Sequence, residues 1–230
     1  MCIGIMQPYF FPYIGYFQLI NCVEKFVIYD DVNFIKGGWI NRNNILLNGD
    51  KSFINVLMNG SSSFKKINEI KIDKNHNKSI FKIEQAYRNA PYFQDFFPIL
   101  KEIILYDSDQ LSIYLTNSIT KISSYIGLNT EIYLSSNIEK DNSLIGQNKV
   151  IEICKKLKSK TYINSIGGQN LYNSNDFNNH NIKLFFLKTN DFNYKQYENN
   201  FVPNLSIIDV LMFNSIEKVK SFLNDFELIK

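Results

Sequence analysis

IGIMQPYFFPYIGYFQLINCVEKFVIYDD, residues 3–31 of the 230-residue chain, is the stretch that decides the fold. Apolar runs at Ile3–Met6 and Phe26–Tyr29 predict two strands, because short buried strands carry continuous apolar residues. Between them, residues 14–24 carry apolar side chains at helical spacing. A strand, a helix and a second strand in this order form a βαβ unit, which predicts parallel strands and a right-handed crossover.

The turn that joins the first strand to the helix has an unusual composition. Residues 7–17 hold two prolines, one glycine, one glutamine and six aromatic residues. Proline fixes its own φ and favours an extended residue before it, so Gln7 and Phe11 are predicted to lie outside the helix. Open α/β sheets bind ligands beyond the carboxyl ends of their strands. This loop is therefore the first candidate binding site, and its candidate contacts are Gln7, Tyr9, Phe10, Tyr13 and Tyr16.

The rest of the chain extends this unit into one α/β domain. Two apolar runs around Asn48-Gly49 predict a β-hairpin at 44–57, and residues 67–72 predict another strand. Helical patterns fill the middle of the chain, after which strands and helices alternate. We expect a single domain, 1–230, with a Rossmann-like parallel sheet, a β-hairpin excursion and a helical insertion at approximately 75–127. A core like that of the nucleotidylyltransferases (HUP-like) is one form of this fold class.

Composition and charge narrow the function classes. Hydrophobic residues make up 45% of the chain and charged residues 20%, which is typical of a globular protein and excludes a disordered one. The net charge of +3 comes from scattered basic residues, so a nucleic-acid partner is not favoured, although a tRNA that carries an acyl donor stays open. No apolar run approaches the ~20 residues of a membrane span, and no basic segment precedes the apolar start. We therefore expect a cytoplasmic protein with no membrane span.

Cysteine and histidine are too few and too scattered for a metal site. Cys2, Cys22 and Cys154 form no CxxC pair, and His76 and His180 are the only histidines. We expect reduced, structural cysteines, solvated histidines, no metal and no tightly bound cofactor.

Two carboxylates follow the second strand. In a parallel sheet the carboxyl ends of neighbouring strands meet at one edge, so Asp30 and Asp31 are expected beside the aromatic loop. One of them could act as a general base or bind a cation. The alternative is that both cap a turn and stay solvated. Asp30 and Asp31 are the candidate catalytic residues.

Residues 36–43, KGGWINRN, contain the only tryptophan of the chain. Paired glycines let the backbone approach a ligand, Trp39 offers a stacking face, and Arg42 can bind phosphate through two hydrogen bonds. The neighbouring Asn41 and Asn43 complete this group of candidate contacts. The alternative is a hairpin turn with Trp39 packed under it.

A predicted strand at 161–164 is followed by a second glycine pair. The backbone amides of Ser165, Gly167 and Gly168 could bind an anion, as amides at a helix start do. The segment lacks the full GxGxxG or P-loop pattern, and a tight strand-to-helix turn would have the same sequence. Near the C-terminus, Ser206 and Asp209 have the spacing of a helix capping box.

These segments together resemble the WbqC-like family of bacterial proteins. The resemblance rests on residues 7–20, YDDVNF at 29–34, WINRN at 39–43, APYF at 90–93, Ser135-Ser136, YINSIGG at 162–168 and LSIID at 205–209. The second of these segments includes Asn33, which joins the candidate contacts.

The resemblance implies a place in the gene clusters of O antigen and related surface polysaccharides. Some members of the family are described as transferases that place glycine or another acyl group on an amino sugar. The implied function is transfer of such a group to the amine of a nucleotide-linked amino sugar, in O-antigen (lipopolysaccharide) biosynthesis. The implied partners are a sugar nucleotide and an activated acyl or aminoacyl donor.

Two alternatives stay open. YIGY at 13–16 is similar to the HxGH turn of nucleotidylyltransferases, but tyrosines stand where those enzymes use histidines. The chain could therefore be a nucleotidylyltransferase-like enzyme, or a non-catalytic protein that binds sugar nucleotides in a glycan assembly pathway.

Overall fold

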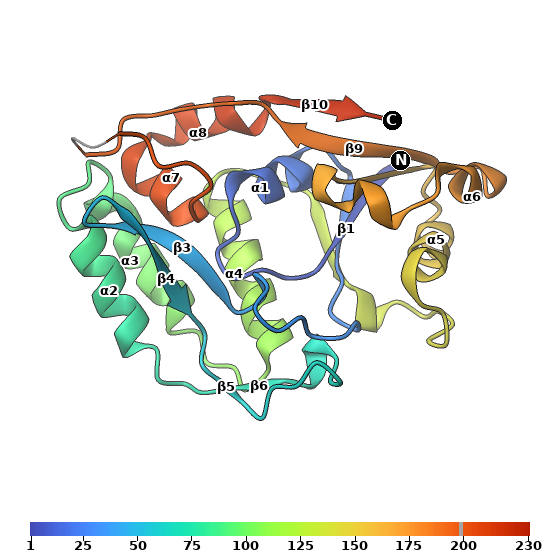
Figure 1. The fold of residues 1–230 in the computed structure, drawn as a ribbon, viewed down its shortest axis with the longest axis horizontal. Coiled ribbons are helices and arrows are strands. Elements are labelled where there is room, and N and C mark those ends of the chain that lie inside the picture. Colours follow the sequence, from blue (N-terminus) through green and yellow to red (C-terminus); the bar gives the residue numbers. More distant parts are fainter. Residues whose placement is uncertain (198–199) are drawn as a thin grey trace.

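A six-stranded sheet forms the centre of the computed structural model, which describes residues 1–197 and 200–230. The strands lie in the order β10-β9-β8-β1-β2-β7, and neighbours are parallel except β9 and β10 (Figure 1). The Rossmann-like α/β class predicted from the sequence is confirmed. The strand bounds are β1 (Cys2–Met6), β2 (Lys25–Ile28), β7 (Glu131–Leu134), β8 (Thr161–Ser165), β9 (Lys183–Thr189) and β10 (Phe226–Ile229).

Helices pack on both faces of the sheet, because successive strand residues point to opposite sides. Ile3 and Ile5 of β1 belong to a core cluster that includes side chains of α5 and α6. Phe26 and Ile28 of β2 belong to a larger cluster with side chains of α1, α4, α7 and α8. The helices that follow the core strands are α1 (Ile14–Asn21), α5 (Gly146–Lys156), α6 (Ser174–Asn179), α7 (Ile207–Phe213) and α8 (Ile216–Leu223).

The hairpin and the middle helices lie where the sequence predicts them. Asn48 and Gly49 both have positive φ, 54° and 85°, as a two-residue turn between antiparallel strands requires. No helix in the described parts of the chain is long and apolar enough to cross a membrane. The bounds are β3 (Arg42–Leu47), β4 (Asp50–Asn55), β5 (Met58–Asn59), β6 (Lys71–Ile72), α2 (Asn77–Tyr87), α3 (Phe93–Ile104) and α4 (Leu111–Tyr125).

Local hydrogen bonds explain where the structure departs from the predicted elements. The sequence predicts a strand at residues 67–72, but Ile67–Glu69 is a 3₁₀ turn and only Lys71–Ile72 forms a strand. The Glu69 carboxylate accepts from the Lys66 amide at 2.8 Å, which closes the turn. Neither α6 nor β10 was predicted, because both are short and carry weak apolar patterns.

Two predictions about polar residues were also wrong. His76, expected in solvent, is 8% exposed and its ring stacks on Tyr114 with centroids 5.0 Å apart. Ser206 does cap α7, since its hydroxyl accepts from the Ile208 amide. The Asp209 carboxylate does not complete a capping box but accepts from the hydroxyls of Tyr87 and Tyr194 at 2.9 and 2.6 Å.

Candidate functional site

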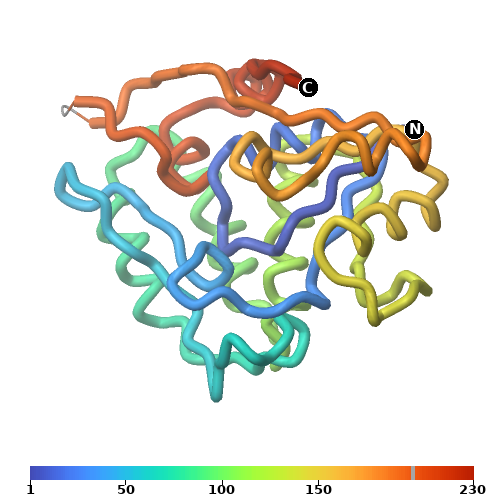
Figure 2. The backbone as a smooth tube through the Cα atoms, turned by 45° about the vertical axis from the view of Figure 1, so that its right-hand side comes forward, coloured from blue at the N-terminus to red at the C-terminus, as the bar shows by residue number. Residues whose placement is uncertain are grey.

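A cleft opens at the carboxyl ends of β1 and β8. β2 and β7 lie on one side of β1, and β8 and β9 lie on the other, so the strand order reverses between β1 and β8. Open α/β sheets bind ligands at this switch point. The cleft has a volume of about 410 Å³. Its walls come from the segments 5–13, 29–39 and 164–172, coloured dark blue, lighter blue and orange in Figure 2.

The residues that line the cleft share one property, which is that none carries a charge. Flat groups and the apolar faces of sugars can stack on the aromatic rings, while amide side chains such as Gln7 can donate and accept hydrogen bonds. The aromatic lining residues are Tyr9, Tyr13, Tyr29, Trp39 and Tyr172. The others are Ile5, Met6, Gln7, Ile35, Asn164, Ser165, Gly167, Gly168 and Leu171.

The phenols of the cleft are neutral hydrogen-bonding groups. Burial raises the pKa of Tyr9, Tyr13, Tyr29 and Tyr172 above the ordinary value of a phenol. The nearby Asp31 carboxylate raises the pKa of Tyr29 further. These tyrosines therefore stay protonated at neutral pH, and they can orient a ligand without acting as bases.

Hydrogen bonds from distant segments hold the aromatic loop in place. Nδ2 of Asn43 donates to the carbonyls of Phe10 and Phe11, at 3.2 and 2.8 Å. The Ser206 hydroxyl also donates to the Phe11 carbonyl, at 2.8 Å, and the Phe10 amide donates to the Trp39 carbonyl, at 3.2 Å. Phe11 has a φ of 43°, which is uncommon for a bulky residue. The surrounding contacts keep it in this conformation.

Gly15 lets Tyr13 lie against the start of α1. A Cβ atom on Gly15 would lie 2.4 Å from Cε2 of Tyr13 and 2.7 Å from Oγ1 of Thr189, so a side chain there would displace both. Tyr13 lines the cleft, but Tyr16 is buried and its hydroxyl donates to the Gln7 carbonyl at 3.0 Å. Tyr13 and Tyr16 occupy the positions of the two histidines in an HxGH turn, but only Tyr13 is placed to contact a ligand in the cleft.

Trp39 separates the cleft from a smaller hollow of about 200 Å³. The hollow is lined by Tyr9, Tyr13 and Trp39, which also line the cleft, and by Asn43 and Asn204. The Trp39 side chain is 45% exposed. A ligand in either space can therefore contact the indole, and Trp39 is not packed under a turn.

Asp31 belongs to a buried charge cluster behind the cleft. Its Oδ2 lies 2.9 Å from Nζ of both Lys140 and Lys149, and all three side chains are nearly fully buried. Burial alone would raise the pKa of Asp31, but the hydrogen bonds and charge of the lysines hold it below its ordinary value. Nζ of Lys149 also lies 5.6 Å from the centre of the Tyr29 ring. The buried Asp30 lies beside this cluster, and the Asp31 charge helps to raise its pKa, so two acidic groups face the two ammonium groups behind the cleft wall.

Asp30 is equally buried and is bound by hydrogen bonds. Its Oδ1 and Oδ2 accept from the amide and the hydroxyl of Ser136, at 2.9 and 2.7 Å. Burial raises the pKa of Asp30 by more than these hydrogen bonds lower it. Neither Asp30 nor Asp31 lines the cleft, so the structure does not bring the two predicted catalytic residues into contact with the predicted substrate contacts.

Arg42 is also turned away from the cleft. Its Nε donates to the Gly38 carbonyl at 3.2 Å, and Nη2 donates to the Gly37 carbonyl. The guanidinium carbon lies 4.6 Å from the centre of the Phe53 ring. Arg42 therefore stabilises its own loop with two of its five N–H donors, and it lines neither the cleft nor the hollow described above.

The remaining predicted contacts divide into two groups. Phe10 is buried in the core, Asn33 is exposed, and Asn41 donates to the Val56 carbonyl. These three line neither the cleft nor the hollow. The structure does bring together Gln7, Tyr9, Tyr13, Trp39, Ser165, Gly167 and Gly168, with Asn43 in the adjoining hollow.

Sequence reasoning missed several residues of this region. Tyr29, Asn164 and Tyr172 line the cleft, and Lys140 and Lys149 lie behind it. The burial of Lys149 could have been predicted, because it lies at the start of the buried face of α5, directly before apolar residues. A buried lysine needs a partner of opposite charge. Lys140 had none, since it lies in a polar loop.

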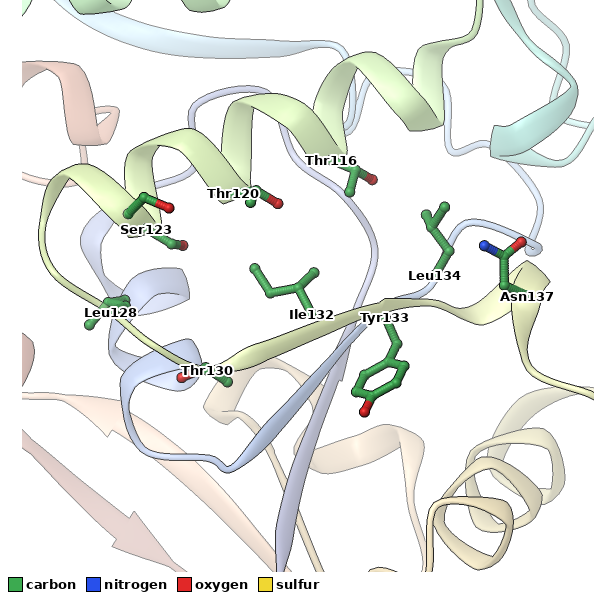
Figure 3. Close-up of a pocket in the computed structure, with 10 residues that line it drawn as sticks. Thr116, Thr120, Ser123, Leu128, Thr130, Ile132, Tyr133, Leu134 and Asn137 are labelled. Atoms are coloured by element: carbon green, nitrogen blue, oxygen red, sulfur yellow. The ribbon is translucent and has the colours of Figure 1, made fainter.

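A second cavity, which we call the groove, lies at the edge of the sheet, between α4 and β7 (Figure 3). Its volume is also about 410 Å³, but its polar groups are mainly hydroxyls, such as those of Thr116, Thr120, Ser123 and Thr130. In residues 1–197 and 200–230, no group of three or more His, Cys, Asp or Glu side chains could hold a metal ion.

The sheet order defines the chain as a Rossmann-like α/β protein, and its cleft lies at the switch point where open α/β sheets bind ligands. The chain belongs to the WbqC-like protein family, whose model matches residues 7–221. It is similar to a protein of Mycobacterium tuberculosis (strain ATCC 25618 / H37Rv), named uncharacterized protein Rv1507c. The two are 28% identical over 220 residues, which cover 92% of this chain and 93% of the relative. No solved structure matches the chain.

Proposed function

We propose that the cleft binds a sugar nucleotide and that the protein transfers glycine or another acyl group to the amine of its amino sugar. The observation that supports this most is the uncharged, aromatic lining of the cleft at the switch point of the sheet. Sugars and nucleobases both offer faces that stack on aromatic rings. The role in O-antigen biosynthesis belongs to the same proposal and comes from the family resemblance.

The aromatic rings would position the base and the sugar. Trp39 stacks on one of these groups and Tyr9 on the other, because both rings line the cleft and the hollow beside it. The side-chain amides of Gln7 and Asn164 bind sugar hydroxyls or the edge of the base. The hollow beyond Trp39 leaves room for the second substrate, an activated acyl or aminoacyl donor.

The diphosphate would be bound without a direct ion pair. Gly167 and Gly168 line the cleft, and their backbone amides can donate to phosphate oxygens, whereas the Ser165 amide already donates to Oδ1 of Asn164 at 2.8 Å. The Lys149 ammonium lies one tyrosine ring away, at Tyr29, but it is paired with Asp31. Hydrogen bonds from the backbone would therefore contribute more to binding of the diphosphate than the charge of this cluster.

The amine has to lose a proton when it attacks an activated carbonyl, and a carboxylate base would assist. Asp30 is the better of the two predicted bases, because its raised pKa makes the carboxylate more basic while the lysines lower the pKa of Asp31. Ser136 donates to both oxygens of Asp30, but each oxygen keeps a lone pair that can accept a proton. Because Asp30 is buried and does not line the cleft, catalysis by Asp30 requires this region to move when the substrates bind.

Binding and transfer can be tested separately. Sugar nucleotides that carry amino sugars should raise the melting temperature of the protein, because a ligand that binds only the folded state stabilises it. Trp39→Ala should abolish most of this shift, whereas Phe81→Ala, which alters an exposed aromatic residue of α2, should leave it unchanged. Absence of a shift with every sugar nucleotide would refute the proposed ligand.

Transfer is measured with the acyl or aminoacyl donors in turn, by mass spectrometry of the sugar nucleotide. Asp30→Asn should remove the product without removing the thermal shift. Unchanged turnover in both Asp30→Asn and Asp31→Asn would refute the base. Binding without product for every donor would favour a non-catalytic sugar-nucleotide-binding protein, and release of pyrophosphate would favour the nucleotidylyltransferase alternative. The proposed location is the cytoplasm, which the three free cysteines support.

A further inference from the structure

Several highly exposed apolar side chains lie at the mouth of the cleft or beside it. Phe64 and Leu171 are 91% and 69% exposed. Leu171 lines the cleft together with Ile35, which is 54% exposed. Exposed apolar residues that cluster around a cleft mark an interaction surface, whereas single ones need no explanation.

Two loops, 32–41 and 58–68, form a continuous part of this surface. The Phe34 amide donates to the Lys65 carbonyl at 2.9 Å, and Asn33 and Lys66 form an antiparallel bridge. These bonds place Ile35 and Lys36 beside Phe64 and Lys65. Figure 2 shows the two loops next to each other, in blue and teal, below the orange loop that carries Leu171.

The charges of these loops have one sign. The loops contain Lys36, Lys65 and Lys66 and no aspartate or glutamate. Glu69 follows directly, and it is exposed although its carboxylate accepts from the Lys66 amide. An anionic partner would therefore meet three lysines and one carboxylate on this part of the surface, which is an excess of positive charge.

The side chains between the lysines favour a lipid surface over a nucleic acid. Apolar side chains can enter the boundary between headgroups and acyl chains while lysines face the phosphates. A nucleic acid would instead stack its bases on flat rings, which Phe64 and Trp39 offer, but the aliphatic side chains of Ile35 and Leu171 fit acyl chains and not bases. The chemistry of the surface thus fits an anionic membrane.

We propose that Ile35, Lys36, Phe64, Lys65 and Leu171 form a docking surface for an anionic lipid membrane. The docked protein would open its cleft towards the lipid headgroups, because Ile35 and Leu171 lie at the mouth of the cleft. Substrate carried at the membrane surface would then reach the cleft directly. Docking does not depend on which ligand the cleft binds.

The test is sedimentation of the full chain with vesicles of phosphatidylcholine, with and without phosphatidylglycerol. The wild type should sediment with the anionic vesicles and be released by salt. Phe64→Ser should weaken this partitioning about ten-fold, because the phenyl group no longer inserts. Lys65→Gln should weaken it about five-fold. Phe81→Ser is the matched control, since Phe81 is 68% exposed on α2, and it should bind as the wild type does.

Three results would overturn the proposal. The first is no sedimentation with either kind of vesicle, and the second is an equal loss for Phe64→Ser and Phe81→Ser. The third is a different occupant of the surface: a dimer that Phe64→Ser dissociates, or binding of tRNA in place of vesicles. Circular dichroism checks that the variants fold. The thermal shift caused by sugar nucleotides should survive Phe64→Ser, which separates this proposal from that for the cleft.

Discussion

The cleft at the switch point and the groove between α4 and β7 have the same volume, about 410 Å³, but different linings. The cleft has five aromatic rings, whereas the groove is lined by hydroxyls. Two of those hydroxyls are already used, since Thr116 donates to the Ser112 carbonyl and Thr130 to the Ile20 carbonyl, but the Ser123 hydroxyl has no hydrogen-bond partner among the described residues. Neither size nor free hydrogen-bonding groups therefore distinguish the two cavities, but the stacking faces of the cleft do.

The two cavities also differ in what lies behind their walls. A buried cluster of Asp31, Lys140 and Lys149 supports the cleft beneath Tyr29. The groove is formed by one face of α4 and the edge strand β7 (Figure 3). Buried charges are costly and are kept where they are paired. The following predictions test whether the cleft is the functional cavity of the two.

The largest effect is expected when the charge cluster loses its carboxylate. Asp31→Asn leaves Lys140 and Lys149 buried without a counter-charge, and it should lower the free energy of unfolding by about 3–5 kcal/mol. Chemical denaturation measures this change. Adding Lys149→Met to Asp31→Asn should recover part of the stability, because one unpaired charge is removed.

The same cluster should make stability depend on acid. The pKa of Asp31 is lower in the folded than in the unfolded chain, so its contribution is full above about pH 4 and is lost as pH falls through the folded pKa. The stability difference between wild type and Asp31→Asn should therefore shrink in acid. Asp191→Asn, at an exposed carboxylate, is the control and should change stability little. A difference that stays constant with pH would contradict the role of the cluster.

The second prediction compares the linings directly. Trp39→Ala should weaken sugar-nucleotide binding about ten-fold or more, because a stacked ring contributes about 1–3 kcal/mol. Thr120→Val in the groove keeps the shape of the side chain and removes its hydroxyl. Like other surface substitutions away from a binding site, it should change the dissociation constant by less than about two-fold. Isothermal titration calorimetry measures both. A larger loss for Thr120→Val would assign the ligand to the groove.

The third and smallest effect concerns two adjacent glycines of the cleft. A Cβ atom on Gly168 would lie 2.6 Å from Nδ2 of Asn164, whereas the nearest atom to one on Gly167 is 4.0 Å away. Gly168→Ala should displace the Asn164 amide, lower stability by about 1 kcal/mol and weaken ligand binding several-fold. Gly167→Ala should leave binding unchanged. Equal effects of the two substitutions would show that the Asn164 amide does not contribute to binding.

The βαβ unit and the parallel sheet could be predicted because their signals are local. The strands at 3–6 and 26–29 are short apolar runs, and Asn48-Gly49 permits the positive φ angles of a tight turn. The edge strand β10 could not be predicted, since it depends on pairing with β9 across the sheet rather than on its own pattern. His76 was placed in solvent for a similar reason, because its partner Tyr114 is far away in the sequence.

The candidate site was predicted by position better than by chemistry. Three segments that end core strands do meet at one cleft, as parallel topology requires. Sequence alone did not show that Arg42 uses its donors within its own loop. It also did not show that Lys140 and Lys149 would neutralise Asp31, because such partners are set by tertiary packing.

The fluorescence of Trp39 provides the most direct test of the central claim. Trp39 is the only tryptophan of the chain and lines the cleft and its adjoining hollow, so its emission reports on this region alone. Titration with nucleotide-linked amino sugars should change the emission in a saturable way, with the same dissociation constant that calorimetry gives. Binding by calorimetry without any change in Trp39 emission would place the ligand elsewhere and contradict the account.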